Sequence, residues 1–232
     1  MSFTFVPDTE KVGQFAGLAG HDVLSDELGV YAASPRFVRE NCGPAANSIL
    51  DSVPDWWFAD CERLGMLPNI DVRLHRLNKG EYPAVPGWHC DGALREKYFG
   101  QPDLERVRIR GTLLGSISSH VDGVSCPEYV TEPVSVELPE NPSDDFVLWR
   151  HVHQQIPAQV ATERMPDGVL RSFSCDTLHR VMPSHNRGFR LLFRMSMWHN
   201  DYLGTDGKVA RAQQVHRVID QETVWVPSEG AG

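Results

Sequence analysis

Two short motifs far apart in the chain carry residue types that suit a metal centre. His89 and Asp91 are separated by one residue, and His179 lies 88 positions after the aspartate. Two imidazoles and one carboxylate can occupy one face of an ion and leave three positions open, the donor set that suits non-haem Fe(II). Open positions allow a cosubstrate and dioxygen to bind together. His89, Asp91 and His179 are therefore the candidate catalytic metal ligands.

Spacing decides which aspartate pairs with the distal histidine. The chain contains two further H-x-D pairs, His120/Asp122 and His199/Asp201. About five short strands and their turns, or roughly 55 residues, must separate the two ligand-bearing segments in a sandwich of strands. The 88 positions after Asp91 are ample, the 57 after Asp122 barely suffice, and no suitable histidine and arginine follow Asp201. The pair at 89 and 91 is the first choice, and the pair at 120 and 122 is the reserve. Taken alone, an H-x-D is more often a simple turn.

A strand-like run after His179 carries two arginines. Its residues alternate with a period of two, which places Phe189, Leu191, Phe193, Met195 and Met197 on one face and Arg190, Leu192, Arg194 and Ser196 on the other. A guanidinium beside a metal would bind a carboxylate through two hydrogen bonds, which a lysine cannot do. The alternative is an amphipathic edge strand whose arginines lie in water.

Composition narrows the classes of partner and compartment. The chain has 232 residues, 22 Lys and Arg against 31 Asp and Glu, and a net charge of −9, which makes nucleic acid an improbable partner. Five cysteines without a C-x-x-C pair predict neither a disulfide framework nor a zinc knuckle, and they fit a reducing cytoplasm. No apolar run reaches the ~18 residues of a membrane span.

The elements that must position these residues are short strands behind a helical segment. Helices are predicted over 35–50, interrupted at Gly43–Pro44, and over 55–64, with Ser34 and Pro35 as N-cap and first helical residue. Strands are predicted over 72–77, 107–118, 129–138, 146–152, 159–162, 169–173 and 189–198. This pattern predicts a mainly β sandwich or jelly roll in one domain. A helical flank (1–65) precedes the core (70–200), and a C-terminal extension (200–232) follows it.

The H-x-D, distal histidine and downstream arginine together resemble the Fe(II)/2-oxoglutarate-dependent dioxygenase superfamily over residues 70–200. The resemblance implies a double-stranded β-helix (a cupin-like jelly roll) with His89, Asp91 and His179 as iron ligands. Arg190 would pair with the distal carboxylate of 2-oxoglutarate, with Arg194 and Ser196 as the alternative. The Gly-then-Tyr run that ends at Tyr82 is similar to one that precedes the H-x-D in some members, where the tyrosine contacts the cosubstrate.

The resemblance also implies an activity. It is the hydroxylation of an unactivated C–H bond of a small molecule, such as an amino acid or a biosynthetic intermediate, with O2 consumed and succinate and CO2 released. Asp91 favours hydroxylation, or a related desaturation or cyclisation, over halogenation, because halogenating members have a small residue at this position. The substrate, the carbon oxidised and the oligomeric state are not predicted.

Two other functions stay open at this point. His151 and His153 are expected on one face of a strand, so a cupin-like metal site without 2-oxoglutarate chemistry is one alternative. A non-catalytic jelly-roll interaction domain is the other. His185 competes with His179, although its position between Ser184 and Asn186 predicts a turn.

Overall fold

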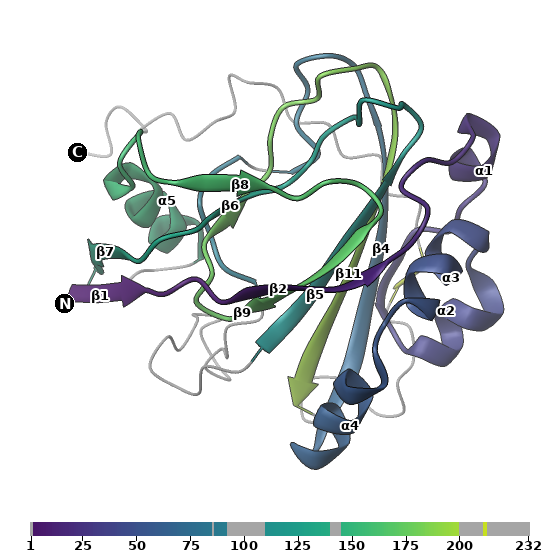
Figure 1. The fold of residues 1–232 in the computed structure, drawn as a ribbon, viewed down its shortest axis with the longest axis horizontal. Helices are drawn as coiled ribbons and strands as arrows, with labels where there is room; N and C mark the ends of the chain where they lie inside the picture. Colours follow the sequence, from purple (N-terminus) through teal and green to yellow (C-terminus); the bar gives the residue numbers. More distant parts are fainter. Residues whose placement is uncertain (1, 85, 92–109, 140–144, 200–210, 213–232) are drawn as a thin grey trace.

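The computed structural model describes residues 2–84, 86–91, 110–139, 145–199 and 211–212, which form mainly antiparallel β-structure with a few helices (Figure 1). The largest sheet has the strand order β12-β3-β4-β11-β5-β9-β2. In that order the strands are Arg211–Ala212, Val30–Ala33, Met66–Leu77, Gly188–His199, Arg110–Ser118, Val169–Ser174 and Thr9–Gln14. All of these pairings are antiparallel.

A three-stranded sheet lies against one face of the large sheet. Its order is β10 (His179–Arg180), β6 (Glu128–Val130) and β8 (Thr162–Arg164). The ring of Tyr129 on β6 meets that of Phe173 on β9 edge to face, with centroids 5.5 Å apart. Because Tyr129 and Phe173 also share a buried cluster with Leu114 and Met165, this face of the large sheet is the interior between the two sheets. Strands β1 (Ser2–Phe5) and β7 (Val134–Glu137) form a separate pair.

Helices cover the opposite face of the large sheet (Figure 1). They are α1 (His21–Ser25), α2 (Pro35–Asn41), α3 (Pro44–Asp51) and α4 (Asp55–Arg63). The predicted interruption at Gly43–Pro44 is confirmed, since α2 ends before it and α3 begins at the proline. The hydroxyl of Ser34 accepts a hydrogen bond from the amide of Phe37 and caps α2, with Pro35 in the first turn as predicted.

Strand β11 lies inside the sheet, between β4 and β5. Its period-two alternation is confirmed, because Phe193 and Met195 are buried in the core beneath the helices. The edge-strand interpretation, in which the arginines lie in water, is wrong. Arg190 is 1% exposed, because β11 is an inner strand and this residue faces the protein interior.

The segment predicted as a strand over 146–152 is instead part of helix α5 (Asp145–Gln155). The prediction gave weight to β-branched and aromatic residues. The buried side chains are Leu148, Trp149 and Val152, and a helix places residues at i, i+1 and i+4 on one side. The helical spacing of these buried residues was therefore a better guide than their strand propensity.

Other boundaries moved for identifiable reasons. The predicted 129–138 strand divides into β6 and β7 around Pro133, which has no N–H for a ladder. The 72–77 strand begins earlier, at Met66, and includes Pro68. That residue is tolerated because β3 pairs with β4 only near Ile70 and Val72, which leaves one side of the strand without a ladder at the proline. The 159–162 strand is shifted to β8, and β1, β2 and β3 were not predicted.

Candidate metal centre

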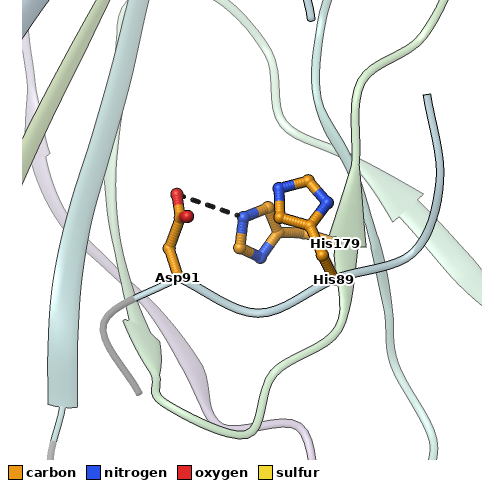
Figure 2. A group of neighbouring side chains, drawn as sticks. All are labelled: His89, Asp91 and His179. Atoms are coloured by element: carbon orange, nitrogen blue, oxygen red, sulfur yellow. Dashed lines mark ion pairs between the residues drawn. The ribbon is translucent and has the colours of Figure 1, made fainter. Parts of the chain in front are cut away.

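The backbone joins two distant segments at the candidate site. His89 and His179 form an antiparallel bridge in which each N–H donates to the other residue's carbonyl, at 3.0 and 2.9 Å. Residues paired in this way place their side chains on the same face of the ladder. The two imidazole rings accordingly lie 4.7 Å apart between centroids (Figure 2). The topology of the chain therefore positions both nitrogen donors.

Both rings are oriented by backbone carbonyls. Nδ1 of His89 lies 2.8 Å from the carbonyl oxygen of Gly87, and Nδ1 of His179 lies 3.1 Å from that of Thr177. A carbonyl only accepts, so in the neutral rings Nδ1 carries the proton and Nε2 keeps its lone pair. Such a second contact fixes the tautomer and orientation of a metal-ligating histidine. Each ring is therefore prepared to bind a metal through Nε2.

The carboxylate of Asp91 completes the cluster. Residues two positions apart in extended chain point the same way, so Asp91 lies on the side of His89. Its Oδ2 is 3.5 Å from Nε2 of His179, and one ligand atom from each residue lies within 4.8 Å of the others (Figure 2). Metal bonds to nitrogen and oxygen are about 2.0–2.2 Å long. Small side-chain rotations are therefore enough to bring the three atoms onto one ion.

Electrostatics keep the donors in their metal-binding protonation states. Burial is the main cause that lowers the pKa of His89 to about 4, so its ring is neutral near pH 7. Burial alone would raise the pKa of Asp91, but the charge of Arg194 outweighs it, and that pKa lies well below its ordinary value. Metal binding requires neutral imidazole and ionised carboxylate.

Arg194 projects from β11 onto the same cluster. Its Nη1 donates to Oδ2 of Asp91 at 2.8 Å, and its Nη2 donates to Oδ2 of Asp71 on β4. Asp71 was not identified from the sequence. The available signal was the alternation in β4, in which Asp71, Arg73 and His75 interrupt the apolar Ile70, Val72 and Leu74.

Arg190 lies four residues earlier on the same face of β11. Within the described part of the chain, none of its three side-chain nitrogens has a hydrogen-bond partner, and each is buried. The carboxylate of Asp167 acts on it electrostatically, while its oxygens accept hydrogen bonds from the hydroxyls of Ser116 and Ser118. Burial lowers the pKa of Arg190. A buried cation without a hydrogen-bonded anion is costly, which marks this position as one prepared for an anionic ligand.

Two further predicted site residues, Ser196 and Tyr82, make no described contact with the three candidate ligands. The hydroxyl of Ser196 on β11 lies 3.5 Å from that of Thr112, and both are buried. Tyr82 is half-buried and follows Glu81, whose carbonyl accepts from the amide of Ser184. The turn that contains Tyr82 is thus joined to the segment after His179.

Competing histidines are not assembled into a second centre in the described part of the chain. His120 and Asp122 lie 3.8 Å apart at an exposed turn. The exposed His185 contacts Arg164. Asp201, from the third H-x-D pair, lies outside the described residues.

The alternative H-x-H site at His151 and His153 does not form, and the strand expected for this segment is wrong. Because both lie on helix α5 rather than a strand, residues at i and i+2 point in different directions. His151 contacts the carbonyl of Glu137 at 2.8 Å, whereas Nδ1 of His153 accepts from the amide of Trp88 at 3.4 Å.

The residues beside the ligands pack behind the small sheet. Cys90, between His89 and Asp91, and the neighbouring Trp88 are both buried in an apolar cluster with β1, β7 and α5. The guanidinium of Arg180 lies 4.3 Å from the Trp88 ring centre and pairs with Glu128. This packing holds the backbone of the ligand segment from the side opposite the imidazoles.

Two features relate to the redox state and the membrane association of the protein. All five cysteines are free thiols. Among the helices of the described ranges, none has both the length and the apolar character needed to cross a bilayer.

Comparisons with known proteins give limited information. No protein-family model matches the chain, and no curated protein matches it. A solved structure described as "Non-heme monooxygenase, ThoJ-Ni complex" is similar at a TM-score of 0.39 and 10% sequence identity, over 83% of this chain and 74% of that one. A likeness of this degree assigns no family.

Proposed function

We propose that the protein is an Fe(II)/2-oxoglutarate-dependent oxygenase that hydroxylates a small molecule. The observation that carries the proposal is the convergence of His89, Asp91 and His179, with both Nδ1 atoms engaged by carbonyls. Two nitrogens and one oxygen suit ferrous iron and leave open coordination positions. The two facing sheets then correspond to a double-stranded β-helix, with the ligands between them.

Arg190 supports a diacid cosubstrate. Its buried nitrogens lack partners, whereas the two terminal nitrogens of Arg194 are occupied by aspartates. Arg190 and Arg194 share the interior face of β11 and are about 13 Å apart at their backbones, given the rise per residue of a strand. We therefore assign the distal carboxylate of 2-oxoglutarate to Arg190, with a bidentate charge-assisted contact.

The remaining chemistry divides between the bound groups and the protein. Bound Fe(II) and 2-oxoglutarate would activate O2, with one oxygen atom entering the substrate C–H bond, the other entering succinate, and CO2 released. The chain orients the donors through the His89–His179 bridge and neutralises the diacid at Arg190. Leu114, Phe173 and Leu192 line the interior between the sheets, where they exclude water from the charged groups.

The substrate class and compartment follow from weaker features. An amino acid or a biosynthetic intermediate is the proposed substrate, and the five free thiols fit the cytoplasm. Asp91 supplies a carboxylate at the third ligand position, which favours hydroxylation over halogenation.

An anaerobic titration tests the proposal directly. Fe(II) and then 2-oxoglutarate are added to the protein, and we expect a weak charge-transfer band near ~500 nm, where such chelates absorb when facial ligands leave open positions. Iron binding without this band would favour a metal protein without 2-oxoglutarate chemistry. Failure to bind iron would favour a non-catalytic interaction domain.

Succinate release identifies the substrate. The iron-loaded protein is supplied with O2, 2-oxoglutarate and a panel of small molecules, and succinate is measured against a reaction without added substrate. We expect one chemical class to raise succinate above that background. A panel without any such compound, together with a normal charge-transfer band, would exclude the tested classes and retain the cosubstrate chemistry.

A further inference from the structure

The contacts of Arg194 connect a candidate metal ligand to the large sheet. One guanidinium nitrogen donates to Asp91 and the other to Asp71, so the side chain bridges two carboxylates. Asp91 lies beyond the His89–His179 bridge and outside any regular strand. Arg194, by contrast, lies in the middle of β11 with ladders on both sides. The ligand with the least regular backbone is therefore tied to a rigid part of the fold.

Asp71 holds the other end of this connection. It is 4% exposed and lies directly across the ladder from Arg194. Its carboxylate also accepts from the amide of Ala32 at 3.0 Å and from Arg73 at 3.3 Å. The amide of Ala32 and the guanidinium of Arg194 make the shortest contacts with Asp71 and hold its carboxylate, and the planar guanidinium transmits that position to Asp91.

We propose that Arg194 is a positioning residue, which holds the Asp91 carboxylate in the orientation that binds the metal, with Asp71 as its anchor. This inference rests on the metal centre proposed above. Arg194 contacts Oδ2 of Asp91, the same oxygen that lies 3.5 Å from Nε2 of His179, so it holds the carboxylate facing the histidine donor. The orientation of Asp91 should affect metal binding, because residues that contact a metal ligand change metal affinity by about 10–100-fold.

Charge and geometry predict opposite results when Arg194 is removed. Loss of a cation beside the site removes a repulsion and, on charge alone, would tighten binding of a divalent ion. Loss of the bridge frees the Asp91 carboxylate to adopt other orientations and weakens binding. The sign of the change in affinity therefore separates the two effects.

The experiment measures Mn(II) affinity by calorimetry on three full-length variants and on the unchanged protein. Arg194→Met is expected to weaken binding about 10–100-fold. Arg194→Lys is expected to weaken it almost as much, because one ammonium cannot reproduce the two-pronged contact. Arg73→Met is the matched control, since Arg73 contacts Asp71 but not Asp91, and its affinity is expected to stay within about threefold of the unchanged protein.

Each outcome has one meaning. Affinity that is unchanged or higher in both Arg194 variants overturns the positioning role while leaving the metal centre intact. Recovery of full affinity by Arg194→Lys alone also overturns it, because charge would then suffice. Absence of Mn(II) binding in the unchanged protein refutes the metal centre and this inference together. Circular dichroism without metal confirms folding, and Arg194→Lys carries the test if Arg194→Met does not fold.

Discussion

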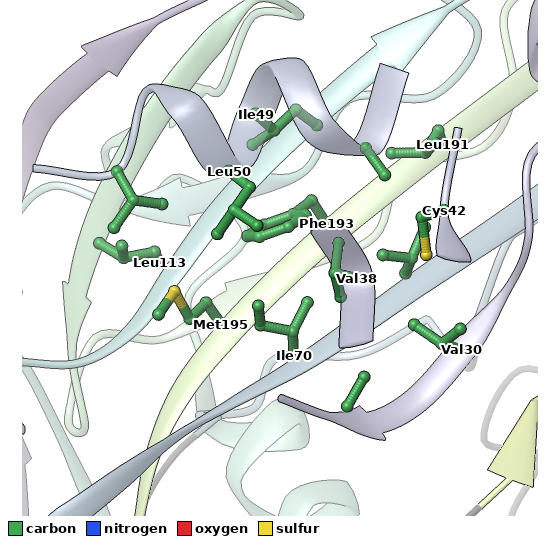
Figure 3. Packing of buried hydrophobic residues seen from close by; sticks show 14 of the residues in the cluster. Val30, Val38, Cys42, Ile49, Leu50, Ile70, Leu113, Leu191, Phe193 and Met195 are labelled. Carbon is green, nitrogen blue, oxygen red and sulfur yellow. The ribbon is translucent and has the colours of Figure 1, made fainter. Parts of the chain in front are cut away.

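The two faces of strand β11 provide the sharpest contrast in the molecule. Toward the helices, Leu191, Phe193 and Met195 pack in a continuous apolar core (Figure 3). Toward the small sheet, the same strand presents the buried Arg190 and the partly buried Arg194, which is paired with Asp71 and Asp91. A single period-two pattern thus places apolar packing and buried charge on opposite sides of one backbone.

The contrast separates stability from function. Burial of a large apolar side chain stabilises a fold by about 1.5–3 kcal/mol. Burial of a charge destabilises it unless a partner compensates. Among the described residues Arg190 has no hydrogen-bond partner, which agrees with the diacid contact proposed above. Substitutions on the two faces should therefore differ in kind, and the following predictions are ordered from the largest expected effect.

Loss of a ligand on the interior side should abolish activity without unfolding the protein. Asp91→Ala removes one of the three proposed ligands, so we expect no substrate oxidation and a loss of metal affinity beyond the ~100-fold typical of outer partners. Asp122→Ala is the matched control, because it alters the exposed H-x-D. Unchanged turnover in Asp91→Ala would remove this carboxylate from the ligand set.

The apolar face should give the opposite result. Phe193→Ala leaves a cavity in a fully buried site and should lower the free energy of unfolding by about 3–5 kcal/mol, measured in urea. Metal affinity of the folded protein should change little, because the side chain points away from the ligands. A large fall in metal affinity of the folded variant would show that the two faces are not independent.

Arg190→Met should reverse the sign of the stability change. Replacing an unpartnered buried cation by an apolar side chain should leave the free energy of unfolding equal or about 1 kcal/mol higher. The concentration of 2-oxoglutarate at half saturation should rise about 10–100-fold, because a charge-assisted contact contributes about 1.5–3 kcal/mol. Arg187→Met, at an exposed site nearby, is the control. Unaltered saturation in Arg190→Met would assign the diacid elsewhere.

A smaller effect tests the helical layer that covers the apolar face. Ser34→Ala removes the hydroxyl that caps α2 and should lower the free energy of unfolding by about 1 kcal/mol. Ser34→Asp should retain stability near the original, since aspartate also caps helices. Equal destabilisation by both substitutions would mean that the hydroxyl acts through another contact.

The sequence predicted correctly the features that depend on residues close together in the chain. The alternation of β11 and the Ser34–Pro35 helix start depend on neighbouring residues, and both are confirmed. The spacing of His89, Asp91 and His179 predicted that they meet, and the structure brings them together, while their role as ligands stays a prediction.

The sequence did not predict features that depend on how distant segments pair in the sheet or on which faces are buried. Asp71, the partner of Arg194, was not identified from the sequence, because it lies across the ladder and 123 positions away in the chain. Strand β2 was missed because its largely polar segment forms one edge of the large sheet and buries little. Helix α5 was misassigned because aromatic and β-branched residues suit either element when one face is buried.

The mutual backbone pairing of His89 and His179 also has a thermodynamic consequence. Closing the 90-residue loop between them costs conformational entropy, which the pairing of the intervening strands offsets. An ion bound there stabilises the native state alone, and at 100 times its dissociation constant adds about 2.7 kcal/mol. Ion binding thus reports that the two donor-bearing segments have come together in the folded chain.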